Sequence, residues 1–145
     1  MNNNHNFDYL VGLAKQMYQE AEKNAAENPT TPTIQVVIVE PNKKPYKEYI
    51  PNNLKAFNEI VGGYIENIFI GDTAKGANIG LIVNEEGKIL NLPYNKRIFG
   101  NSDYYDILVG TIIITAYNLQ GDNISLTDQE ADKYIKRFST FEVYL

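Results

Sequence analysis

The chain has 145 residues, a net charge of −5 and no cysteine, and each of these facts excludes a class of protein. The length suits one domain that buries roughly 70% of the surface exposed by the unfolded chain. The negative charge opposes general binding to a phosphate backbone, so we expect neither DNA nor RNA as a partner. Without cysteine there are no disulfides, thiolate nucleophiles or zinc–sulfur sites, and no apolar run is long enough to cross a membrane. We therefore expect a cytoplasmic protein without a cofactor and without membrane contact.

Residues 1–27 are predicted to form a polar tail followed by a helix. "MNNNHN" is polar, and from Asp8 onward apolar side chains recur at helical spacing, namely Leu10, Leu13, Ala14, Met17, Tyr18 and Ala21. "NPTTPT", residues 28–33, ends this helix because proline cannot continue one, and it is predicted to be a linker. Residues 34–145 are predicted to form a single α+β domain.

The first half of this domain is predicted to contain four strands and one helix. "TIQVVIVEP" is apolar on both faces, which indicates a central strand, whereas "PYKEYI" indicates a more exposed one. "NNLKAFNEIVGG" predicts a helix that Asn52 or Asn53 caps and that ends with Gly62 in a left-handed conformation. Its buried stripe is predicted to consist of Leu54, Phe57, Ile60 and Val61. "YIENIFI" and "NIGLIV" are the next two predicted strands.

The second half is predicted to begin with a tight turn, "EEGK", that leads into a strand, "KILNL". "DILVGTIIITAY" is the longest β-type run, and its Gly110 indicates a bulge or a close backbone approach. "SLTDQEADKYIKRF" predicts a helix whose capping box consists of Thr127 and Glu130, and "FEVYL" predicts a final edge strand. Strands and helices do not alternate regularly, so we predict an α+β fold. Its sheet is mainly antiparallel or mixed, with five to six strands packed by two or three helices.

Few residues in this chain suit catalysis. His5 is the only histidine and lies in the polar tail, so we expect neither a catalytic triad nor a histidine-ligated metal. A carboxylate-dependent hydrolase or transferase is still an alternative. It requires that Glu66 or Glu85 be buried in a cleft near a second carboxylate, because burial separates the two pKa values.

The stretch "IVNEEGKILNLPYNKR" contains two asparagines that have two interpretations. In the first, Asn84 and Asn95 each brace a turn where a strand ends, because a short amide side chain bonds nearby backbone. In the second, both amides converge with tyrosine and arginine beside paired glycines and bind a nucleotide or another small polar anion. The residues predicted to bind such a ligand are Gly62, Gly63, Glu66, Asn84, Glu85, Tyr94, Asn95 and Arg97.

The chain also contains eleven tyrosines, which favour contact with another protein because tyrosine supplies rigid amphipathic area. "NSDYYD" is the stretch most typical of an interface, so Tyr104 and Tyr105 are predicted to contact a partner. The N-terminal helix is predicted as a second contact, through which the chain would form a homo-oligomer.

Four segments resemble an uncharacterised family, the domain of unknown function family numbered 3846. They are "QVVIVEPNKKPYKEYIPNNLKAFNEIVGGYIENIFI", "LIVNEEGKILNLPYNKRI", "ILVGTIIIT" and "SLTDQEADKYIKRF", which together run from about Ile34 to Phe138. "VGGYIE" and "NEEGKILNLPYN" are the most specific parts. The family occurs in phage and plasmid proteins of Gram-positive bacteria, so the resemblance implies a mobile-element context and no reaction.

We therefore hypothesise a non-enzymatic accessory protein that acts in the cytoplasm of a bacterial host. It would bind a host macromolecule, expected to be a protein, and inhibition of a host defence system is one version of this role. Sequestration of a small nucleotide-like ligand is the first alternative, and the carboxylate-dependent enzyme is the second.

Overall fold

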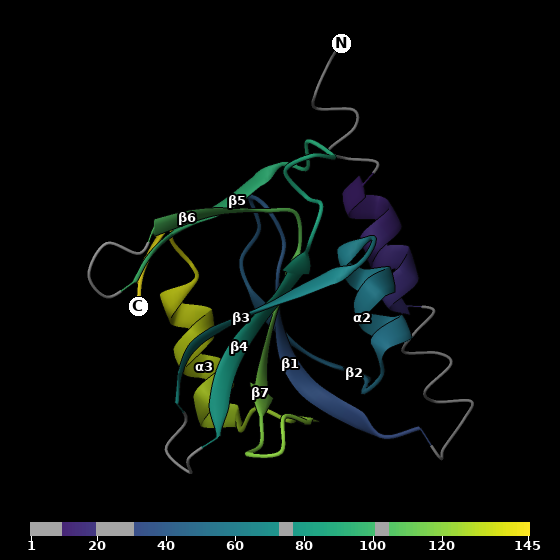
Figure 1. Ribbon diagram of the computed structural model, residues 1–145, viewed down its shortest axis with the longest axis vertical. Helices are drawn as coiled ribbons and strands as arrows, with labels where there is room; N and C mark the ends of the chain where they lie inside the picture. The colour runs from purple at the N-terminus through teal and green to yellow at the C-terminus, as the bar shows by residue number, and fades with distance from the viewer. Residues whose placement is uncertain (1–9, 20–30, 73–76, 101–104) are drawn as a thin grey trace.

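The computed structural model describes residues 10–19, 31–72, 77–100 and 105–145 of the chain. Residues 10–19 are helical. The elements that follow are β1 (Thr33–Val39), β2 (Tyr46–Pro51), α2 (Leu54–Val61), β3 (Ile65–Asp72), β4 (Asn78–Asn84), β5 (Tyr94–Phe99), β6 (Tyr105–Val109), β7 (Ile112–Tyr117), β8 (Asn123–Ile124), α3 (Asp128–Arg137) and β9 (Glu142–Tyr144) (Figure 1). None of the helices in these ranges is both long enough and apolar enough to span a bilayer.

The strands form two sheets. The main sheet has the order β2-β1-β7-β4-β3, with β8 paired to β7, and each of these pairs is antiparallel. The small sheet has the order β6-β5-β9, in which β6 is antiparallel and β9 parallel to β5. This mostly antiparallel arrangement, with helices packed on it, confirms the predicted α+β class.

The main sheet separates two hydrophobic cores. Figure 1 shows α2 and the helical residues 10–19 on one side of this sheet, with α3 and the small sheet on the other. Successive side chains of β7 enter different cores, since Ile113 packs in the cluster that contains Phe57 of α2, whereas Ile114 packs with Phe138 beside α3. β1 lies between β2 and β7 and is buried on both faces, which confirms that it is a central strand.

The predicted ends of α2 are confirmed, but its predicted buried stripe is partly wrong. The Asn53 side chain accepts a hydrogen bond from the Ala56 N–H at 2.8 Å, and Gly62 has φ 80°. Leu54, which was predicted to be buried, is 59% exposed, and Ala56 is buried instead. At 100° per residue, the buried side chains from Ala56 to Val61 are centred about a quarter turn away from Leu54.

The prediction of a strand in "KILNL" is wrong, because residues 85–91 form turns. The Leu90 N–H donates to the Glu86 carbonyl at 2.9 Å, and Asn91 has a positive φ of 54°, which no extended strand adopts. Ile89 is 83% exposed, so the apolar residues here do not mark a buried face. The strand of this region is β5, which begins at Tyr94 and was not predicted.

"DILVGTIIITAY" is not one strand but two, which belong to different sheets. Gly110 lies between β6 and β7 with φ 74°, and its N–H donates to the Pro93 carbonyl at 2.8 Å. A Cβ atom at Gly110 would lie 2.8 Å from Leu92 Cδ1, so the predicted close approach is confirmed. At this point the chain passes from the small sheet into the main sheet. The turn needs a positive φ, which glycine adopts readily and other L-residues rarely adopt.

The C-terminal elements agree with their predictions. Thr127 Oγ1 accepts from the Glu130 N–H at 3.1 Å, and the Thr127 N–H donates to Glu130 Oε1 at 2.8 Å, which completes the capping box of α3. β9 is an edge strand, as expected for "FEVYL". The division into a tail and helix, a linker and a domain stays a prediction, because residues 1–9 and 20–30 lie outside the described ranges.

Candidate functional site

Asn84 joins the end of α2 to the turn that follows β4. Its Nδ2 donates to the Val61 carbonyl at 3.0 Å, and its Oδ1 accepts from the Glu86 N–H at 2.8 Å. A Cβ atom at Gly63 would lie 3.0 Å from Asn84 Nδ2, so the paired glycines do lie beside this amide. The bond to Glu86 confirms the interpretation in which the Asn84 amide braces a turn.

Asn95 joins three segments of backbone. The pairing of β5 with β6 shifts between Tyr94 and Lys96, and Asn95 lies at this irregularity, where its side chain is only 2% exposed. Its Nδ2 donates to the Val39 carbonyl at 2.8 Å and to the Gly110 carbonyl at 2.7 Å. The Asn95 amide therefore holds the end of β1 and the junction before β7 against β5.

The other residues predicted to bind a ligand do not join the two asparagines in one concave site. Glu66 and Glu85 are exposed, which is not the burial that the carboxylate enzyme requires. Tyr94 is 70% exposed, and Arg97 lies on the outer face of the small sheet. Ligand binding by these residues stays a prediction. In the described ranges, no group of three or more acidic or histidine side chains is placed to hold a metal ion; His5 is outside them.

The outer face of the small sheet carries a row of three aromatic rings. Side chains alternate along β5, so Ile98 enters the core while Phe99 points outward. Phe99 pairs with Tyr105 on β6 and with Tyr144 on β9. Its ring centroid lies 5.4 Å from that of Tyr105 and 4.8 Å from that of Tyr144, and the latter pair is stacked at 13°. The row therefore crosses the full width of the sheet.

Arg97 lies next to this row and is held by rings and by one carboxylate. Its Cζ lies 5.8 Å from the ring centroids of both Tyr105 and Phe141, within the range of a cation–π contact. Its Nη1 lies 3.7 Å from Glu142 Oε1. The guanidinium donates no hydrogen bond to any residue in the described ranges, and its Nε is buried. Arg97 thus has a carboxylate nearby, while most of its N–H groups keep their hydrogen-bonding capacity.

Glu142 also orients the ring at the end of the row. The Tyr144 hydroxyl donates to Glu142 Oε2 at 3.2 Å. This hydrogen bond, together with the negative charge of Glu142, raises the pKa of the Tyr144 phenol above its ordinary value. Glu142 therefore contacts both Arg97 and Tyr144, and the surface around the row carries paired charges.

These six residues, Arg97, Phe99, Tyr105, Phe141, Glu142 and Tyr144, are called the aromatic face below. Tyr105, Phe141 and Tyr144 are 49%, 47% and 65% exposed, although the opposite side of the same sheet is buried in the core. Large exposed rings gathered on one surface are typical of a binding site. Tyr105 was predicted to contact a partner, whereas Tyr104 lies outside the described ranges.

Three of these rings were not predicted, namely Phe99, Phe141 and Tyr144. The alternation in "YNKRIF" and "EVY" indicates which side chains share a face of each strand. It does not indicate that β9 pairs with β5, because that pairing joins residues 45 positions apart in the chain.

The sequence was compared with known families, curated proteins and solved structures. Residues 34–139 match a family described as a domain of unknown function, DUF3846. Searches among curated proteins and among solved structures each found no significant match. The matched residues include β5 and β6 of the aromatic face, whereas the helical residues 10–19 and β9 lie outside the match.

Proposed function

The chain belongs to the DUF3846 family, whose description names no reaction, and we propose that it is a non-enzymatic binding protein of a phage or related mobile element. It acts on a host protein through the aromatic face, and inhibition of a host defence protein is the role that best suits this context. The observation that carries the proposal is the row formed by Tyr105, Phe99 and Tyr144, which is aligned across three strands and open on its outer side.

The chemistry of the aromatic face favours a protein over a nucleic acid as the partner. The cores of protein interfaces are rich in tyrosine, phenylalanine and arginine and poor in unpaired charge. Here the one cation, Arg97, already pairs with Glu142 at 3.7 Å, and the whole chain carries a net charge of −5. Neither feature suits a surface that neutralises phosphates.

Two kinds of contact are available to the partner. The rings of Tyr105 and Tyr144 offer apolar faces that an aromatic or aliphatic side chain can cover. Arg97 offers N–H donors that suit a backbone carbonyl or a carboxylate of the partner, since its only ion pair is the one with Glu142 within the described ranges.

Affinity capture from a lysate of the bacterial host tests the proposal when the wild-type protein is compared with a variant of the aromatic face. The wild-type protein and the double variant Tyr105→Ser/Tyr144→Ser are immobilised, and retained proteins are quantified by mass spectrometry. The matched control is Tyr49→Ser/Tyr64→Ser, which removes two tyrosines of similar exposure, 56% and 71%, from elsewhere on the surface. We expect a host protein that the wild type and the control retain and that the aromatic-face variant loses by about tenfold or more.

Two results would overturn the proposal. One is that no retained protein distinguishes the aromatic-face variant from the control, provided that circular dichroism shows both to be folded. The other comes from a thermal-shift screen with nucleotides. A saturable rise in Tm of several degrees that is lost in Arg97→Ala would make nucleotide sequestration the better account.

A further inference from the structure

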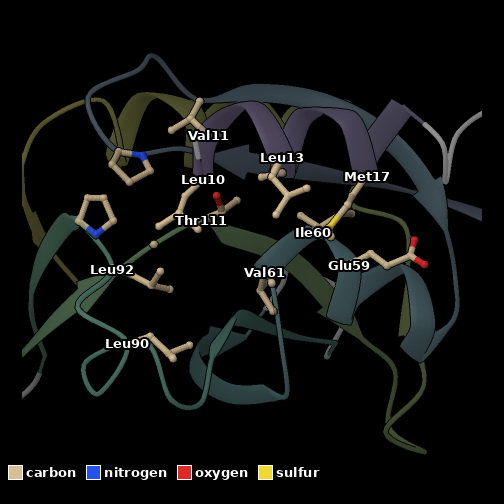
Figure 2. Close-up of a pocket in the computed structure, with 15 residues that line it drawn as sticks. Leu10, Val11, Leu13, Met17, Glu59, Ile60, Val61, Leu90, Leu92 and Thr111 are labelled. Carbon is tan, nitrogen blue, oxygen red and sulfur yellow. The ribbon is translucent and has the colours of Figure 1, made fainter. Parts of the chain in front are cut away.

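An apolar cavity of about 220 Å³ lies between the helical residues 10–19 and the rest of the protein. Figure 2 shows the side chains that line it, with Leu13 and Met17 on the helix above, Ile60 and Val61 of α2 on one side, and Leu90 and Leu92 below. The cavity shares no residue with the aromatic face.

The helix formed by residues 10–19 lines the cavity with apolar side chains that do not fill it. Leu10, Leu13 and Met17 recur at helical spacing and line the cavity, yet each is only partly buried. Tyr18, next to them, is 8% exposed and packs fully against the core around α2. The helix therefore packs on the rest of the protein through Tyr18, while Leu10, Leu13 and Met17 face the cavity. At the border of the cavity, Leu90 is 52% exposed.

The size and lining of the cavity set the kind of molecule that fits. An apolar cavity of about 150 Å³ excludes water and admits benzene, so a cavity about half as large again admits an unbranched chain of about six carbons. Apolar side chains of leucine, isoleucine, methionine, valine, alanine and proline provide most of the wall, which offers water few hydrogen-bonding partners. An aliphatic chain is thus the natural occupant of the interior.

The negative charge of Glu59 at the edge of the cavity favours a ligand whose polar end is positively charged. Among the lining residues Glu59 is the only charged one, and in Figure 2 its carboxylate lies at the outer side of the group, away from Leu92. Glu59 Oε1 pairs with Lys55 Nζ at 3.9 Å, but Lys55 is 79% exposed, so this ion pair is weak and exchangeable. A positively charged group at the end of the chain can replace Lys55, whereas a carboxylate would be repelled.

We propose that this cavity binds a small amphipathic amine, with an aliphatic chain of about six carbons in the interior and its ammonium group at Glu59. This site is independent of the aromatic face, so either can fail without the other.

Three probes of equal chain length test the proposal on the full-length protein: n-hexylamine, n-hexanol and hexanoate. Isothermal titration is expected to show saturable binding in the order hexylamine, hexanol, hexanoate, with hexylamine about two- to fivefold tighter than hexanol. The variant Glu59→Gln is expected to remove the difference between hexylamine and hexanol, because it keeps the shape of the side chain and removes its charge.

Two variants that fill the cavity from opposite walls complete the test. Ala14→Phe adds a ring from the helix, and Leu92→Trp adds one from below; each is expected to weaken hexylamine binding at least tenfold. Leu119→Trp is the matched control, since Leu119 is 80% exposed and does not line the cavity. The proposal is overturned if hexylamine does not bind saturably, if hexanoate binds as tightly, or if a folded filling variant binds like the control.

Discussion

Asn84 and Asn95 stabilise the fold by bonding buried main-chain carbonyls at or next to the ends of helices and strands. The Val61 carbonyl lies in the last turn of α2, where no later helical N–H reaches it, and Asn84 Nδ2 bonds it at 3.0 Å. The Val39 and Gly110 carbonyls are both bonded by Asn95 Nδ2. Because a buried carbonyl without a partner costs about 1–3 kcal/mol, each amide contributes to the stability of the chain whether or not it also binds a ligand.

Replacing Asn95 by alanine is expected to lower the free energy of unfolding by about 2 kcal/mol, since two buried carbonyls lose their donor. Urea denaturation followed by circular dichroism measures the change. Gln129→Ala removes an amide from the exposed side of α3 and is expected to change stability by less than about 0.5 kcal/mol. Equal effects of the two substitutions would contradict the role assigned to Asn95.

The neighbouring Lys96 makes the stability depend on pH in a specific direction. It is 6% exposed, and burial lowers the pKa of its ammonium group. The unfolded chain, in which the pKa of lysine is about 10.4, then binds more protons than the folded chain between the two pKa values. The contribution of Lys96 to stability is therefore unfavourable at pH 7 and becomes less so as the pH rises towards about 10.4.

Lys96→Met is expected to stabilise the protein at pH 7, because it keeps the buried stem and removes the charge. The gain in urea midpoint over the wild type should shrink when both proteins are measured at pH 10. Titration of the tyrosines affects both proteins alike, so it cancels in this difference. A gain that grows with pH would show that burial does not lower the pKa of this lysine.

Among the elements, the junction at Gly110 decides how the strands are divided between sheets. β6 enters it from the small sheet and β7 leaves it into the main sheet. Its φ of 74° and the nearness of Leu92 Cδ1 both require a residue without a Cβ atom. Asn95 also stabilises this junction, because its Nδ2 donates a hydrogen bond to the Gly110 carbonyl.

Gly110→Ala is expected to lower the free energy of unfolding by about 2–3 kcal/mol, from backbone strain together with crowding of Leu92. The same substitution at Gly12 is the matched control. Gly12 is helical, and its added Cβ would meet no atom within 4 Å, so alanine there is expected to stabilise by about 0.5–1 kcal/mol. Thermal unfolding of both variants distinguishes the two signs, and destabilisation at both positions would count against the argument from local geometry.

At the scale of the whole molecule, the main sheet couples the two cores. β7 is buried on both faces and lies between β1 and β4, so neither core can lose its packing without disturbing the strand that serves the other. We therefore expect the chain from β1 to β9 to unfold as one unit, in agreement with the single domain predicted for residues 34–145.

Ile113→Val and Ile114→Val test this coupling with the same change on opposite faces of β7. Each removes one buried methylene and is expected to lower the free energy of unfolding by about 1 kcal/mol. Far-UV circular dichroism and tyrosine fluorescence should report one transition, which both variants shift equally. Two transitions, each sensitive to only one of the variants, would show that the cores unfold separately.

The sequence by itself determined the parts of this protein that depend on near neighbours along the chain. The end of α2 at Gly62 and the capping box of α3 depend on residues close together in the chain, whereas the choice of Asn53 over Asn52 as the cap of α2 came from the structure. β1 was identified as central because an uninterrupted apolar run suits burial on both faces. The same local patterns sufficed to indicate the α+β class and the family.

Only the tertiary structure decided which side chains share a surface and which face each other across a gap. The aromatic face requires β9 to lie parallel to β5, and the cavity requires the N-terminal helix to lie over α2 and the turn before β5. Likewise, the sequence alone does not show which backbone carbonyl a short amide such as that of Asn84 bonds, and only the structure identifies it as the Val61 carbonyl. These contacts join segments far apart in the chain, so their free energy depends on how the whole chain packs, which no local pattern of residues records.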